Sequence, residues 1–225
     1  MVRRPGSLLL FLALLPGLAV AHGVARGDAS FLEQIDGVRF FPLMYLGAKH
    51  MVTGYDHLLF LAGVIFFLYR LRDVALYASL FALGHSATLL GSVLLGYRAN
   101  PFIVDAIIGL SVVYKAFENI GGFRQLGIAI DSRAAVLVFG LIHGLGLATK
   151  LQELALSRNG LVGNMIAFNI GVELGQLAAL SVMVLLFALW RSTASFERSA
   201  FGANVLLMMA GFILFGYQIA GVFHV

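Results

Sequence analysis

The sequence predicts an all-α membrane protein, a polytopic bundle of six transmembrane helices that follows a cleavable signal peptide. Apolar residues make up 60% of the 225 residues and charged residues only 12%, whereas soluble domains carry roughly 45–50% and about 25%. The mean hydropathy of +0.95 agrees. This composition excludes a soluble enzyme, because so little charge cannot cover a water-soluble surface. The small net charge of +4 excludes a nucleic-acid binder, and the absence of Cys excludes thiolate chemistry.

Residues 1–21 have the layout of a secretory signal peptide. Arg3 and Arg4 precede an apolar run that is too short to span a bilayer, and Ala19-Val20-Ala21 supplies the small residues that signal peptidase requires. We expect cleavage after Ala21, with an uncleaved anchor helix as the alternative. Cleavage would make His22 the first residue, where its imidazole and the α-amine either chelate a metal ion or have no role.

Residues 22–43 form a short periplasmic segment, and residues 44–225 form the membrane domain. A helix needs about 20 predominantly apolar residues to cross the hydrocarbon core. Runs of this kind predict six spans, at residues 44–69, 74–96, 101–118, 134–151, 162–189 and 202–223. Lys49, His50 and Asp56 interrupt the outer half of the first span, and Asn100-Pro101 caps the third. No sequence repeat relates the two halves of this domain.

The basic residues of the loops predict which way the bundle faces. With the N-terminus outside, the cytoplasmic loops hold Arg70, Arg72, Arg124, Arg133, Arg191 and Arg198, and the opposite loops hold only Arg98, Lys150 and Arg158. Cytoplasmic loops carry an excess of Lys and Arg, so both termini are expected in the periplasm. This agrees with the signal peptide and predicts a multi-pass protein of the bacterial inner membrane.

Four potential metal or proton ligands lie near the middle of four different spans: His57, His85, His143 and Glu173. Ionisable groups at this depth are costly, about 2.5–3.5 kcal/mol for Asp or Lys, so they face an interior, pair or serve a function. At about 100° per residue, His57, His85 and Glu173 each belong to a polar face of their helix. These faces comprise His50, Thr53 and His57, then His85, Thr88 and Ser92, then Asn169, Glu173 and Gln176. We expect each polar face to point into the bundle.

These side chains suit a divalent transition metal such as Ni, Co or Zn. Neutral imidazole binds such ions, and a carboxylate supplies the charge that a cation needs in a low-dielectric medium. The expected ligands are His57, His85, His143 and Glu173. Asp56 is expected to bind the ion or to hold a His ligand in one tautomer. Asn169 and Gln176 would orient Glu173 or bind the waters of the ion.

A second, outer site is expected nearer the periplasm. His50 and Asp105 lie at similar depth in the first and third spans, and together they would meet an incoming cation. The alternative is that Asp105 only caps polar groups near the membrane interface.

Residues 50–57 read H-M-V-T-G-Y-D-H and precede the apolar run Leu58–Leu61. This motif resembles the H-P-x-x-G-x-D-H signature of the HupE/UreJ family, with His50, Gly54, Asp56 and His57 at the shared positions and Met51 in place of the proline. Members have a cleavable signal followed by about six spans and are regarded as nickel or cobalt permeases. Gly84-His85-Ser86 and residues 169–176 resemble the second, less characterised subgroup. The resemblance implies the same fold and a nickel or cobalt substrate.

Three classes of function stay open, with a permease for nickel or cobalt favoured. An intramembrane zinc hydrolase would use three protein ligands and an activated water, with Ser86 or Asp56 as acid or base. A metal-binding accessory protein would hold the ion without moving it. The same polar groups could also merely hydrogen-bond helices together. The expected partners are the lipid bilayer and a metal ion, and the oligomeric state is open, a homo-oligomer included.

Overall fold

The structure, a computed structural model, describes residues 26–154 and 157–223. All regular structure in these ranges is helical, which confirms the predicted all-α class. The helices are α3 (Arg26–Gln34), α4 (Phe40–Thr53), α5 (Tyr55–Ile65), α6 (Leu71–Leu95), α7 (Pro101–Asn119), α8 (Gly122–Gln125), α9 (Ser132–Leu151), α10 (Leu161–Arg191) and α11 (Ala194–Val222). The predicted signal peptide and His22 lie outside the described residues.

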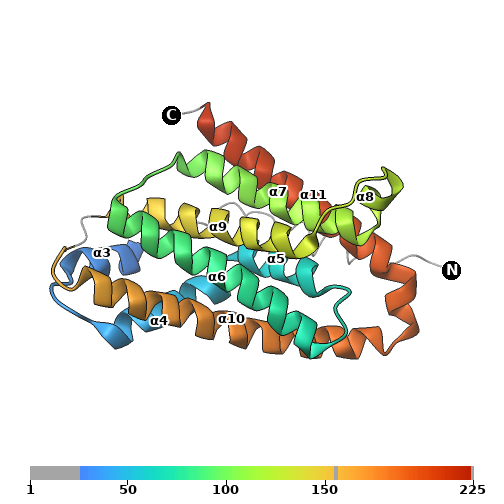
Figure 1. Cartoon of the computed structure of the whole chain (residues 1–225), viewed down its shortest axis with the longest axis horizontal. Coiled ribbons are helices and arrows are strands. Elements are labelled where there is room, and N and C mark those ends of the chain that lie inside the picture. Colours follow the sequence, from blue (N-terminus) through green and yellow to red (C-terminus); the bar gives the residue numbers. More distant parts are fainter. Residues whose placement is uncertain (1–25, 155–156, 224–225) are drawn as a thin grey trace.

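Four of these helices, α6, α9, α10 and α11, are long and apolar enough to cross a membrane. Helix α7 has 19 residues and coincides with the predicted third span. At its start, the Asn100 side chain accepts a hydrogen bond from the Ile103 N–H. Figure 1 shows the long helices along the longest axis, with α3 at one end and α8 at the other. We call these ends of the bundle the α3 end and the α8 end. The chain is a multi-pass membrane protein, and the count of six spans stays a prediction.

The prediction of one continuous helix over residues 44–69 is wrong. Helix α4 ends at Thr53 and α5 begins at Tyr55, with Gly54 extended between them (φ −73°, ψ 98°). Glycine is unfavourable inside a helix, and no larger residue fits here, because a Cβ at residue 54 would lie 2.9 Å from His57 Nδ1 and 3.1 Å from Asp56 Oδ1. The missing side chain therefore leaves room for both polar groups at the break.

The helices pack as three tight pairs, α4 with α10, α6 with α9, and α7 with α11. Small residues allow helix backbones to approach closely within a membrane. A Cβ at a glycine of these pairs would meet backbone atoms of the partner helix; these glycines are Gly47, Gly84, Gly109, Gly140, Gly144, Gly171, Gly175 and Gly211. The G-x-x-x-G motifs of α9 and α10 thus lie at helix contacts.

Helix α5 lies inside the bundle, where it contacts α4, α6, α7, α10 and α11. Its side chains Phe60, Leu61 and Ile65 are fully buried. The Arg191 guanidinium of α10 donates to three carbonyls at and just after the C-terminal end of α5, those of Ile65, Phe66 and Leu68. This half-helix therefore carries Asp56 and His57, in its first turn, into the centre of the bundle.

Candidate metal site at the break in the first span

Four histidines from four helices meet beside the break at Gly54. They are His50 of α4, His57 of α5, His85 of α6 and His143 of α9. The His57 ring is in the middle, with its centroid 5.3 Å from that of His50, 5.6 Å from His85 and 5.0 Å from His143. His57, His85 and His143 have no exposed surface, and His50 is half-buried. We call these four residues the histidine cluster.

The Asp56 carboxylate holds the central ring of the cluster. Its Oδ1 lies 3.1 Å from His57 Nδ1, and the Asp56 side chain is only 2% exposed. The Asp56 carboxylate thus fixes the orientation of the imidazole and brings a negative charge to the site.

Imidazole nitrogens of the other three histidines are available to a ligand. His143 Nδ1 donates to the Phe139 carbonyl at 2.7 Å, which leaves Nε2 as the acceptor nitrogen. Among the described residues, His143 Nε2, His50 Nε2 and both ring nitrogens of His85 are buried without a hydrogen-bond partner. A buried polar atom in this state costs about 1–3 kcal/mol, and binding an ion is one role that explains it.

The ring nitrogens of the cluster are not directed at one point. In the described part of the chain, no group of three or more His, Asp or Glu side chains is arranged to hold a metal ion. The His57 ring meets the other three rings edge to face, at interplanar angles of 80°, 69° and 69°. A bound ion would therefore require the rings to turn about their side-chain torsions.

A layer of three phenylalanines closes the cluster toward the α8 end. Each lies one helical turn from a histidine, in the pairs Phe60 with His57, Phe81 with His85, and Phe139 with His143. The Phe60 centroid is 5.4 Å from that of Phe81 and 5.7 Å from that of Phe139. The sequence carries a signal for this layer, a Phe three or four residues from a His in three spans, which the predicted site did not include.

Toward the α3 end, Asp105 is paired with Lys150. Lys150 Nζ donates to Asp105 Oδ2 at 2.6 Å, and the two side chains are 15% and 5% exposed. His50, the other residue of the predicted outer site, lies in the histidine cluster. The charge pattern of the loops included Lys150, although this residue lies within the span predicted at 134–151 and, in the structure, in the last turn of α9. The structure thus gives Asp105 a cationic partner.

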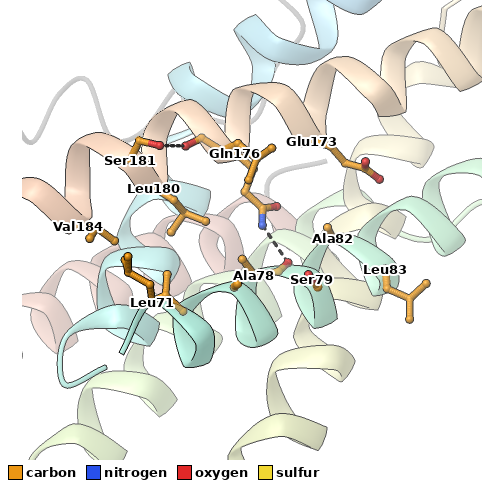
Figure 2. Close-up of a pocket in the computed structure, with 13 residues that line it drawn as sticks. Leu71, Ala78, Ser79, Ala82, Leu83, Glu173, Gln176, Leu180, Ser181 and Val184 are labelled. Atoms are coloured by element: carbon orange, nitrogen blue, oxygen red, sulfur yellow. Dashed lines mark hydrogen bonds between the residues drawn. The ribbon is translucent and has the colours of Figure 1, made fainter. Parts of the chain in front are cut away.

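The expectation that Glu173 faces the bundle interior is wrong. Its side chain is exposed and lines a groove of about 650 Å³ between α6 and α10 (Figure 2). At 100° per residue, Glu173 shares a face of α10 with the exposed residues Ile166, Ile170 and Leu177. The buried Asn169 and Gln176 lie at the edge of this face, so their polarity did not identify the interior side.

The remaining candidate residues lie around the site without joining the cluster. The Asn169 amide donates to the Met165 carbonyl of its own helix, and the Gln176 amide donates to the Ala78 carbonyl of α6 at 2.9 Å (Figure 2). Thr53 is exposed and donates to the Lys49 carbonyl. Because the helix breaks at Gly54, Thr53 and His57 do not share one helix face as predicted. Half-buried Ser86 follows His85, and its hydroxyl has no hydrogen-bond partner among the described residues.

A comparison with protein families decides what the chain is related to. A family model described as HupE / UreJ protein matches residues 26–225. The chain belongs to the HupE/UreJ family. No curated protein and no solved structure matches the chain. The family match confirms the resemblance drawn from residues 50–57, and membership of this membrane family suggests a role related to nickel or cobalt transport.

The family motif of this HupE/UreJ protein coincides with the break. His50 lies in the last turn of α4, Gly54 forms the break, and Asp56 and His57 lie in the first turn of α5. Four motif residues from two half-helices are thereby brought to one place.

Proposed function

We propose that this HupE/UreJ protein is a permease for a divalent transition metal, nickel or cobalt, and that the ion binds at the histidine cluster. The observation that carries the proposal is the meeting of His50, His57, His85 and His143 from four helices. Three of them have buried nitrogens without hydrogen-bond partners among the described residues. Neutral imidazole nitrogens are ligands that suit Ni and Co, whereas Mg and Ca prefer oxygen ligands.

Asp56 and the broken helix supply the negative potential that a divalent cation needs in a low-dielectric interior. The C-terminal end of α4, which carries the negative end of its helix dipole, lies beside the cluster at Gly54. The N-terminal end of α5 has the opposite sign, and the Asp56 carboxylate in its first turn offsets it. Discontinuous transmembrane helices form ion sites of this kind in secondary transporters.

The ion is proposed to travel from the α3 end, past Asp105 and Lys150, to the cluster. It would leave toward the α8 end past the phenylalanine layer. The excess of basic residues in the loops at the α8 end supports a cytoplasmic α8 end and an inner-membrane location. Glu173 is left out of the proposed ligand set because its side chain is exposed.

Uptake by the purified protein in liposomes tests the proposal. Ni, Co, Zn and Cu are offered to wild type, to His57→Ala and His143→Ala, and to Glu173→Gln as the matched control outside the cluster. We expect saturable uptake of nickel or cobalt by wild type and Glu173→Gln, and its loss in both His variants. Bound metal without flux would instead indicate an accessory protein. Neither binding nor flux would mean that the histidines only hold helices together.

A further inference from the structure

Two of the three helix pairs make the same contacts residue for residue. Gly84 of α6 lies against the backbone of Leu137 and Leu141 of α9. Gly171 of α10 lies against the backbone of Met44 and Ala48 of α4. Adding one constant number to the residues of α4 gives the equivalent residues of α9, Met44 to Leu137 and Ala48 to Leu141. Adding a second constant to the residues of α6 gives those of α10, Gly84 to Gly171.

The reciprocal contacts obey the same two offsets. Gly140 of α9 lies against the Phe81 carbonyl of α6, as Gly47 of α4 lies against the Phe168 carbonyl of α10. The ring contacts follow the same relation. The ring centroid of His143 lies 5.0 Å from that of Phe81, and the ring centroid of His50 lies 6.3 Å from that of Phe168. His50 and His143 are therefore equivalent positions.

The third pair corresponds to itself. Gly109 of α7 lies against Phe215 N and Gly211 O of α11, and Gly211 lies against Val113 N and Gly109 O of α7. The pattern that relates α4 to α9 and α6 to α10 thus also exchanges α7 with α11. The first set of equivalent helices is α4, α6 and α7, and the second is α9, α10 and α11. Because α4 begins at the α3 end and α9 begins at the α8 end (Figure 1), equivalent helices of the two sets run in opposite directions through the bundle.

The histidine cluster lies where these two sets meet. The equivalent residues His50 and His143 both contact the ring of His57, at 5.3 and 5.0 Å. Equivalent contacts between helices that follow in the same order along the chain but run in opposite directions define two inverted repeats, related by an axis in the membrane plane. Inverted repeats around a midplane site are the architecture of carriers that expose one site alternately to either side.

Building on the proposed function, we propose that this protein transports its cation as an alternating-access carrier made of two inverted repeats, not as a pore. The pairs α4/α10 and α6/α9 move against each other as two units, with the histidine cluster between them. The units meet where α6 faces α10, and there the Gln176 amide donates to the Ala78 carbonyl on the α8 side of the cluster. The equivalent positions on the α3 side are Leu89 and Met165, both buried. The structure, with His57, His85 and His143 fully buried, is the closed state of this cycle.

Counterflow distinguishes a carrier from a pore. Liposomes that hold wild-type protein are loaded with unlabelled nickel or cobalt, and entry of a radioactive tracer of the same metal is followed. A carrier exchanges ions faster than it completes net transport, so we expect the preload to accelerate tracer entry several-fold. Saturable uptake without this acceleration would overturn the carrier and leave the proposed permease intact. Absence of both uptake and binding would overturn the permease, and the carrier with it.

Crosslinking tests the moving units, and the absence of native Cys makes the design clean. The Cys pair Ala78→Cys with Gln176→Cys joins the units on the α8 side, and Leu89→Cys with Met165→Cys joins them on the α3 side. The control pair, Thr88→Cys with Leu141→Cys, lies within the α6/α9 unit, where the Thr88 hydroxyl donates to the Leu141 carbonyl at 2.6 Å. Each variant is measured before and after a short, reducible bis-thiosulfonate crosslinker, so that it serves as its own reference.

We expect either crosslink between the units to abolish tracer exchange, with recovery on reduction, and the crosslink within one unit to leave exchange in place. The two pairs between the units should crosslink at similar rates, since the repeat makes them equivalent. Exchange that survives both crosslinks between the units would overturn the proposed motion. Failure of the Leu89/Met165 pair to react while Ala78/Gln176 reacts would overturn the equivalence of the repeats.

Discussion

At the scale of single residues, Gly54 decides the shape of the proposed site. Its backbone angles suit any amino acid (φ −73°), so its role is to leave space beside Asp56 and His57. Replacing Gly54 by Ala should push these two side chains away and favour a continuous helix. We expect metal affinity to fall by about 10–100-fold, the effect of losing a partner that orients a ligand. Isothermal titration of nickel or cobalt measures it, and an unchanged affinity would contradict the role of the break.

The Asp105–Lys150 pair makes a second prediction at this scale. Lys150→Met leaves the buried Asp105 carboxylate without its cation, which should lower the free energy of unfolding by about 3–5 kcal/mol. Asp105→Asn combined with Lys150→Met removes both charges and should recover most of this loss. Denaturant unfolding in detergent compares the variants. Additive losses in the double variant would show that the two side chains do not depend on each other.

Residue-level reasoning from the sequence placed His57, His85 and His143 near one depth, because distance along a helix converts directly into depth. It did not place Glu173, because the direction that a polar face takes depends on which neighbours the helix packs against. In α10, the residues that pack against α4 turn Glu173 to the surface. The pairing of Asp105 with Lys150 joins two different helices, and no local pattern specifies it.

At the scale of helices, the glycine contacts predict opposite effects for two substitutions in α6. A Cβ at Gly84 would lie 2.5 Å from the Leu137 carbonyl oxygen and 2.8 Å from Leu141 N of α9, whereas a Cβ at Gly91 would meet nothing within 4 Å. Gly84→Ala should therefore destabilise the fold by about 1–3 kcal/mol. Gly91→Ala should stabilise it by up to about 1 kcal/mol through helix propensity. Thermal unfolding of both variants checks this, and equal shifts would contradict the close approach of α6 and α9.

Apolar length predicted the later helices well because it is a local property of the chain. The spans expected at 134–151 and 162–189 correspond to α9 (Ser132–Leu151) and α10 (Leu161–Arg191). The break at Gly54 and the inverted repeat are different, because both depend on contacts between helices. The repeat leaves only short traces in residue identity, G-x-x-H at 47–50 and 140–143 and F-x-x-G at 81–84 and 168–171, while equivalent positions such as His85 and Val172 share no chemistry. The prediction that no sequence repeat relates the two halves missed these short matches.

At the scale of the whole molecule, the orientation of the bundle makes a direct prediction. Tyr97, near the α3 end, is 60% exposed, and Leu126, next to α8, is 64% exposed. In intact bacterial cells, an impermeant maleimide should label Tyr97→Cys. Leu126→Cys should react only after the inner membrane is opened, because the positive-inside rule places the α8 end in the cytoplasm. The reverse pattern would invert the bundle and the proposed direction of transport.

The histidine cluster is proposed to bind the transported ion, and this can be tested directly. X-ray absorption spectroscopy of the nickel- or cobalt-loaded protein at the metal edge measures the ligands directly. We predict a first shell that contains several imidazoles and loses imidazole signal when His85 or His143 is replaced by Ala. A spectrum with oxygen ligands alone, unchanged in both variants, would contradict the account and move metal binding away from the cluster.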